Sequence, residues 1–215
     1  MFIVKKGFTL AEVLITLLIV GVIASIVIPG LIADTQNAEY KTAWKKGYAD
    51  LSQATKRILM DNGGTLKGIC TNSNCLRDLY LQYLNFSKKC DAGTTLGNCF
   101  DSTTKALSGA VITGDWFTSF TSYSGVILAN GNFVLFVYNS NCNWTPTISN
   151  VCGSIITDIN GFRGPNTFGK DIYKTYILQN SIPPFGVQGD GNESDCNTNP
   201  PSGSGLGCSA RYLYQ

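Results

Sequence analysis

The sequence predicts an α+β protein. A long N-terminal α-helix, whose first half spans a membrane, packs on a small antiparallel β-sheet head with disulfide-tied loops. Three observations lead to this prediction. An apolar run near the start passes into an amphipathic stripe, short runs rich in β-branched and aromatic residues follow in the second half, and eight cysteines lie after the apolar run. With 215 residues, the chain has room for one ordinary domain and one anchor.

The apolar run extends from Phe8 to Ile28, and Glu12 is its only charged residue. As a helix it would be about 31 Å long, which is the thickness of a bilayer core. Lys5 and Lys6 precede it. By the positive-inside rule, the short leader stays in the cytoplasm and the chain after Ile28 is exported. The run therefore predicts a single-pass membrane protein with an exported C-terminal part.

The run differs from an ordinary secretory signal, whose apolar core is shorter and is followed by a small-residue cleavage site. Residues 25–27 offer only a poor site of that kind, whereas the small residue Gly7 lies before the run. A plain signal anchor stays open on these grounds. It leaves Glu12 unexplained, because a carboxylate inside a membrane span is costly and usually functional.

The segment KKGFTLAEVLITLLIVGVIASIVIPGL, residues 5–31, resembles the N-terminal segment of type IV pilins and type II secretion pseudopilins. The resemblance implies that a prepilin peptidase removes residues 1–7 by cleaving between Gly7 and Phe8, and that Phe8 is then N-methylated. It also implies that the apolar helix is retained as the spine of a filament. Gly21 and Pro29 stand where such pilins carry helix-weakening residues.

Glu12 has a physical role in such a filament. Cleavage leaves an amine on Phe8, about one helical turn from the Glu12 carboxylate. The two groups could pair within one subunit, or Glu12 could meet the Phe8 amine of a neighbour in a staggered assembly. A buried charge without a partner is strongly destabilising. Only the axial stagger that pairs the two charges is therefore stable. Snorkelling of the Glu12 side chain to the cytoplasmic face is the alternative.

Gly21 and Pro29 bound the weakest part of the predicted helix. Proline removes one N–H group and clashes with the carbonyl four residues earlier, here that of Ser25. Glycine weakens a helix by about 1 kcal/mol. The stretch between them would therefore bend or melt most easily. A static kink, which is common in membrane helices, is the alternative.

After Pro29 the helix is predicted to continue with one apolar face. Apolar and aromatic residues recur at spacings of three and four, at Tyr40, Trp44, Tyr48, Leu51, Thr55, Ile58 and Leu59. The glycine pair after Asn62 ends the helix. We therefore expect a membrane and filament-core half over residues 8–30 and an amphipathic half over residues 31–62.

The globular head is predicted over residues 63–215, with its sheet at about 125–180. Residues 126–138 are typical of a hairpin, because the Asn130-Gly131 pair at its centre suits a tight primed turn. Residues 154–157 and 172–178 supply two further strands.

The rest of the head is expected to be irregular. Residues 64–120 carry helical turns at about 76–84, and residues 181–215, rich in Pro, Gly, Ser and Asn, form a C-terminal loop region.

Eight cysteines on the exported side imply disulfides in an oxidising compartment. The count alone does not fix their pairing. Proximity in the sequence suggests the local pairs Cys70–Cys75, Cys90–Cys99, Cys142–Cys152 and Cys196–Cys208. A metal cluster is the rival, but the chain has no CxxC spacing and no histidine to assist.

The segment from Asp158 to Asp171 is richer in polar residues than packing requires. Asp158 and Asn160 put two oxygen ligands on one side of a turn, and Asp171 could complete a hard-cation site. Some pseudopilins hold calcium in a loop of the sheet region, so the resemblance supports structural calcium here. The alternative is a connection in which Gly and Asn adopt positive φ and the Asp side chains cap backbone N–H groups. No other cofactor is expected.

Composition narrows the function. Charged residues make up 14% of the chain, against roughly 25% in soluble proteins, the net charge is +2, and histidine is absent. These values exclude His-based nucleophilic sites and give no strong field for nucleic acid. We expect no enzyme, but a structural subunit of a type IV pilus-like filament. A pseudopilin of a secretion or competence system, and a minor tip pilin acting as a binding module, are the alternatives.

The resemblance also implies partners and a location. The precursor would wait in the bacterial inner membrane, in contact with lipid, until it is processed by the peptidase and methylase. An assembly platform driven by a cytoplasmic ATPase would then draw it into a homo-oligomeric helical filament together with minor pilins. The filament would lie on the cell surface or in the periplasm.

Overall fold

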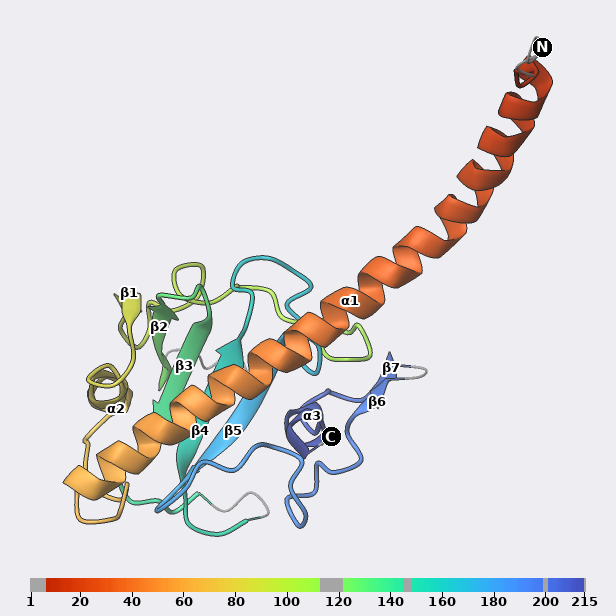
Figure 1. Cartoon of the computed structure of the whole chain (residues 1–215). Helices are drawn as coiled ribbons and strands as arrows, with labels where there is room; N and C mark the ends of the chain where they lie inside the picture. Colours follow the sequence, from red (N-terminus) through yellow and green to blue (C-terminus); the bar gives the residue numbers. More distant parts are fainter. Residues whose placement is uncertain (1–6, 113–121, 145–147, 199–200, 215) are drawn as a thin grey trace. The chain divides into compact units, whose positions relative to one another are not determined.

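The computed structural model describes residues 7–112, 122–144, 148–198 and 201–214 (Figure 1). The chain divides into two compact units, Met1–Glu39 and Tyr40–Gln215. The first contains the N-terminal part of helix α1 (Leu10–Asp61), and the second contains the rest of that helix and the whole head. The predicted leader, apart from Gly7, lies outside the described residues.

Helix α1 is continuous through Gly21 and Pro29 and ends where the sequence predicts. Gly63 and Gly64 both have positive φ, at 70° and 82°. The Gly64 N–H donates to the Leu59 carbonyl at 2.7 Å, which satisfies one of the carbonyls that a helix end leaves free. The glycine pair therefore terminates the helix by adopting a left-handed backbone that other residues rarely take.

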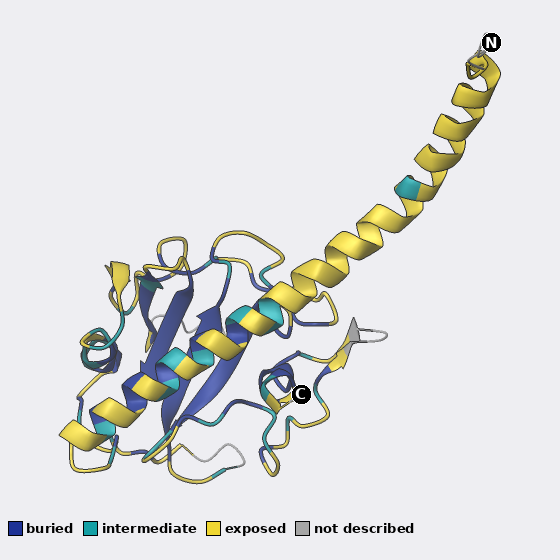
Figure 2. Ribbon diagram, in the orientation of Figure 1, coloured by how far each residue is buried: buried dark blue, intermediate teal, exposed yellow. Residues whose placement is uncertain are grey.

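The predicted stripe on α1 faces the sheet (Figures 1 and 2). Trp44, Leu51, Thr55 and Ile58 are buried, whereas Tyr40, Tyr48 and Leu59 are half-buried at its edges. The stripe also includes the small residues Gly47 and Ala54, which are buried as well. The helix–sheet packing expected from the spacing of these residues is thus present.

The main sheet has five strands, all paired antiparallel to their neighbours in sequence order. They are β1 (Phe86–Cys90), β2 (Ser124–Leu128), β3 (Phe133–Tyr138), β4 (Val151–Asp158) and β5 (Ile172–Leu178). The predicted hairpin forms β2 and β3, and the two further predicted strands form β4 and β5. Strand β1 was not predicted.

The turn between β2 and β3 corrects the predicted primed turn. The Gly131 N–H donates to the Leu128 carbonyl at 3.0 Å, and the Leu128 N–H donates to the Asn132 carbonyl at 2.9 Å. Gly131 has positive φ, at 87°, while Asn130 does not. A primed turn of type I′ needs positive φ at both central residues. The turn is therefore centred one residue earlier, and Gly131 follows it in the left-handed position.

Both faces of the sheet are buried. The residues of β3 alternate: Val134 and Phe136 join Leu51 and Ile58 of α1 in one core cluster. On the other face, Phe133, Leu135 and Val137 join a second cluster, together with Ile172, Tyr176 and Leu178 of β5. Side chains from the long connections cover this second face, among them Phe100, Phe168, Phe185 and Leu206. The irregular segments thus complete the core.

Lys174 is the one charged residue of β5 and lies on this second face, where it is buried. Its ammonium group lies 4.6 Å from the centre of the Phe185 ring. Burial lowers the pKa of Lys174 to about 8, because an apolar environment disfavours the charged form.

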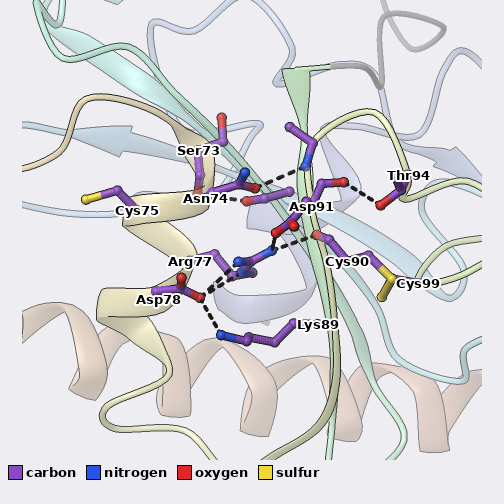
Figure 3. A network of polar contacts seen from close by, with 12 residues as sticks. Ser73, Asn74, Cys75, Arg77, Asp78, Lys89, Cys90, Asp91, Thr94 and Cys99 are labelled. Carbon is purple, nitrogen blue, oxygen red and sulfur yellow. Dashed lines mark hydrogen bonds and ion pairs between the residues drawn. A yellow bond between two sulfur atoms is a disulfide. The ribbon is translucent and has the colours of Figure 1, made fainter.

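Helix α2 (Ser73–Tyr80) accounts for the predicted helical turns, and a polar network joins it to β1 (Figure 3). The buried Arg77 guanidinium donates from Nη1 to the Cys90 carbonyl at 2.7 Å and to Asp91 at 3.0 Å. Arg77 also forms an ion pair with Asp78. Since a buried guanidinium must be fully paired, this network fixes the connection between α2 and the edge strand.

The C-terminal region is not the loop that the sequence predicted. It contains β6 (Asn197–Thr198), β7 (Pro201–Ser202) and helix α3 (Cys208–Tyr214). The Trp44 indole N–H donates to the Ser209 carbonyl at 3.0 Å, and Trp44, Tyr173 and Tyr212 share a third core cluster. The last part of the chain therefore packs on the start of the buried stripe.

The eight cysteines form four disulfides. They are the pairs suggested by proximity in the sequence: Cys70–Cys75, Cys90–Cys99, Cys142–Cys152 and Cys196–Cys208. Each closes a short segment, and the last ties α3 to the strand pair that precedes it. The covalent links thus fix the irregular connections locally.

Candidate functional site

The predicted cleavage junction lies just before α1. Gly7, Phe8 and Thr9 precede the first helical residue, Leu10. The side chain of Phe8 is 89% exposed. The peptide bond between Gly7 and Phe8 therefore lies outside the helix.

Glu12 and Thr9 form a capping box at the start of α1. The Glu12 carboxylate accepts hydrogen bonds from the Thr9 N–H and the Thr9 hydroxyl, both at 2.8 Å. In return, the Glu12 N–H donates to the Thr9 hydroxyl at 3.2 Å. This arrangement satisfies N–H groups that a helix start leaves free. The sequence analysis missed the role of Thr9, although the T-x-x-E spacing is a recognised signal for it.

The surface of α1 after this box is apolar and uncovered. Every residue from 7 to 39 is exposed except Ala24, which is half-buried (Figure 2). The helix contains a window long and apolar enough to cross a membrane, with a mean hydropathy of 2.7 and no buried residue. Because contiguous apolar patches of this size mark lipid or protein contacts, this surface is suited to contact with a lipid bilayer or with another protein.

The loop between β4 and β5 brings together the three residues singled out as possible cation ligands. Asp158 ends β4 and Asp171 directly precedes β5, and both are fully buried. Asp158 Oδ1 accepts the N–H groups of Asn160 and Gly161 at 3.1 and 3.0 Å. These are the backbone caps expected of a turn-rich connection, so that alternative accounts for one oxygen of Asp158.

Asp171 has the same capping role on the other side of the loop. Its two oxygens accept the N–H groups of Asn166 and Thr167, at 2.8 and 2.7 Å. Burial, and to a smaller extent the nearby Asp171 charge, raise the pKa of Asp158 to about 8. Burial also raises the pKa of Asp171. The loop thus holds two carboxyl groups close together in an apolar setting, which is a costly arrangement.

One cleft bears on the alternative of a binding module. It has a volume of about 390 Å³ and is lined by α1, by the end of β2 with the turn that follows it, and by residues 83–85. Lys46 and Arg57 line it together with Asp50. Because an acidic residue stands among the basic ones, the cleft does not have the uniform positive charge that nucleic acid requires.

The chain matches the family described as the prokaryotic N-terminal methylation motif over residues 4–28, which is the signature of type IV pilins and pseudopilins. No curated protein and no solved structure matches the chain. The motif implies processing by a prepilin peptidase and assembly into filaments in general. Together with the long apolar helix, it fits a precursor anchored in the inner membrane.

Proposed function

We propose that this chain, which carries the N-terminal signature of type IV pilins and pseudopilins, is a structural subunit of a type IV pilus-like filament. In this proposal a prepilin peptidase cleaves between Gly7 and Phe8, Phe8 is methylated, and the processed chain polymerises through α1. The observation that carries the proposal is the uncovered apolar surface of α1, which begins directly after the junction and bears one carboxylate, Glu12.

Polymerisation would exchange lipid for neighbouring helices. In the bilayer the apolar surface of α1 contacts acyl chains, and in a filament it would contact the same surface of other subunits. Apolar contact does not favour one axial stagger of neighbouring helices over another. Lipid acyl chains are as apolar as leucine side chains, so an apolar surface that faces lipid costs no more than one that faces a neighbouring helix. A charge pair between Glu12 and the Phe8 amine of a neighbour would fix it, since both charges would otherwise be buried alone.

The head would supply the outer surface of the filament. Its sheet is buried on both faces and its connections are tied by four disulfides. Such a head resists local unfolding, which suits a mechanical role outside the cell. We propose no catalytic activity for it, and no role for nucleic acid as a partner of this subunit.

The proposed partners are the prepilin peptidase and methylase, an inner-membrane assembly platform with its cytoplasmic ATPase, and minor pilins. A pseudopilus of a type II secretion or competence system would use the same N-terminal chemistry. The two alternatives differ in where the finished filament lies, on the cell surface or within the periplasm.

Shearing of intact cells tests this proposal. We expect the processed chain in the sheared filament fraction, and the Gly7→Leu variant, whose junction no longer has a small residue, to stay in the membrane fraction. Recovery of the processed chain in filaments only after the outer membrane is opened, and not in the sheared fraction, would favour the pseudopilus. A processed chain that enters no filament in either case would contradict the proposal.

A further inference from the structure

Two loops of the head carry exposed cationic and apolar side chains. Arg163 and Lys170 belong to the β4–β5 loop, and Lys105 belongs to the connection between β1 and β2; all three are exposed. None of them takes part in an ion pair with any residue that the structure describes. In the same two loops, Phe162 is 50% exposed and Val111 is 53% exposed. We call these five residues the basic surface.

Backbone hydrogen bonds join the two loops. The Lys105 N–H donates to the Asn166 carbonyl at 2.9 Å, and the Phe168 N–H donates to the Lys105 carbonyl at 2.9 Å. Lys105 also pairs with Val111 in an antiparallel bridge. The members of the basic surface therefore come from segments that are fixed against one another.

The β4–β5 loop lies where α1 enters the head (Figure 1). The Asn160 side-chain amide donates from Nδ2 to the Tyr40 hydroxyl at 3.3 Å. The same nitrogen donates to the carbonyl of Gly164, the residue after Arg163, at 3.0 Å. Tyr40 is the first residue of the compact unit that contains the head. The basic surface is therefore at the end of the head that directly follows the apolar part of α1.

The length of the helix keeps this end of the head close to any membrane that α1 spans. Ile32 is the last large apolar residue before Asp34, and the helical rise from Ile32 to Tyr40 is about 12 Å. The headgroup layer of one leaflet takes up roughly 5–7 Å of this distance. Electrostatic interactions extend over a further 8 Å or about that at physiological ionic strength. Charges at this end of the head are therefore within reach of phospholipid headgroups.

The outward charge of the two loops is positive. Over residues 102–112 and 159–170, the charged residues are Lys105, Arg163 and Lys170. The acidic residues that flank these ranges do not oppose them at the surface, because Asp158 and Asp171 are fully buried and Asp101 is half-buried. Surfaces that combine exposed cations with exposed apolar side chains are typical of proteins that bind anionic lipid.

We propose that the basic surface contacts anionic phospholipid headgroups of the membrane that α1 spans. The three cations attract the headgroup phosphates, and each is expected to strengthen the contact about fivefold. Phe162 and Val111 then lie at the boundary between the headgroups and the acyl chains, where exposed apolar side chains are favoured. This contact concerns the membrane-anchored chain, so it does not depend on the filament role.

Amine acylation of the full-length protein in lipid nanodiscs tests the contact. The discs contain phosphatidylcholine alone or an equal mixture with phosphatidylglycerol, and mass spectrometry measures the acylation rate of each lysine. We expect Lys105 and Lys170 to react at least about fivefold more slowly in the anionic discs. Molar salt should remove this difference, because it shortens the Debye length to about 3 Å. Equal rates for these two lysines in both kinds of disc would overturn the proposal.

A variant and an internal control locate the contact on the head. Arg163→Gln removes one cation but no measured lysine, and it is expected to reduce the ratio of protected to reactive Lys170 about fivefold. Lys67 is the control, because it is exposed but follows the far end of α1. Its own acylation rate should not depend on the lipid, and Lys67→Gln should leave Lys170 protected. Full protection of Lys170 in Arg163→Gln would overturn the assignment. Protection that appears only in discs with two chains would also overturn it, in favour of a second copy of the chain.

Discussion

Replacing Trp44 by alanine is expected to lower the free energy of unfolding of the head by about 3–5 kcal/mol. The indole is fully buried and stacks on Tyr173, with 4.7 Å between the ring centres. Its N–H donates to the Ser209 carbonyl of α3. The substitution therefore removes the side chain that joins α1 to both β5 and the C-terminal helix. Chemical denaturation followed by near-UV circular dichroism measures the change.

Two further variants separate packing from hydrogen bonding. Trp44→Phe keeps much of the buried ring but loses the bond to Ser209, so we expect a smaller loss. Tyr48→Ala, at the half-buried edge of the stripe, is also expected to cost less than Trp44→Ala. A single hydrogen bond contributes about 1 kcal/mol. If the free energy of unfolding of Trp44→Ala lies within that amount of the value for the unmodified chain, the packing of α1 on the head does not depend on the Trp44 contacts.

Replacing Glu12 by alanine is expected to reduce filament yield at least about tenfold, because a buried charge left alone costs more than the 1.4 kcal/mol that corresponds to a factor of ten. Membrane insertion and cleavage should be unaffected, since the change makes the span more apolar. The amount of processed chain in the membrane and filament fractions measures both effects.

Glu39→Ala is the matched control for this variant. Glu39 is an exposed acidic residue on the same helix but outside the apolar run, so its loss should leave filament yield unchanged. A normal yield from Glu12→Ala would show that the carboxylate does not set the stagger. A loss of cleavage in that variant would move its role from assembly to processing.

The sequence predicted those elements whose burial has a simple period. The α1 stripe repeats every three to four residues, and β5 was predicted over 172–178, the bounds it has in the structure. The hairpin predicted over residues 126–138 forms β2 and β3, and the residues of β3 alternate between the two faces of the sheet. In each case one regular element packs on another, so the pattern of apolar residues reports the packing directly.

The elements that sequence analysis missed lack such a pattern. Strand β1 is an edge strand with four exposed residues, including Lys88 and Lys89, so no face of it is marked by burial. Helix α3 is short and follows a glycine-rich segment, and it packs through contacts with Trp44 and Tyr173 that are distant in sequence. Tertiary contacts, rather than local preference, form both elements.

The residues of the candidate sites also divide into those that a local sequence motif marks and those that only the folded structure shows. The junction and Glu12 were predicted because the N-terminal segment is a local motif, while the capping role of Thr9 was overlooked. In the β4–β5 loop, Asp158, Asn160 and Asp171 were singled out from their spacing, but Asn166 was not. Its N–H bonds to Asp171, a contact that forms only in the folded loop.

The mass of the N-terminal peptide, measured on protein from cells that contain an active prepilin peptidase, tests the central claim most directly. If the chain is a pilin-type subunit, the peptide begins at Phe8 and carries one methyl group on its amine. Cells without the peptidase should yield the peptide that begins at Met1. A chain that begins at Met1 in both strains, or that begins after Ser25, would contradict the claim, because α1 would then be an ordinary anchor or a cleaved secretory signal.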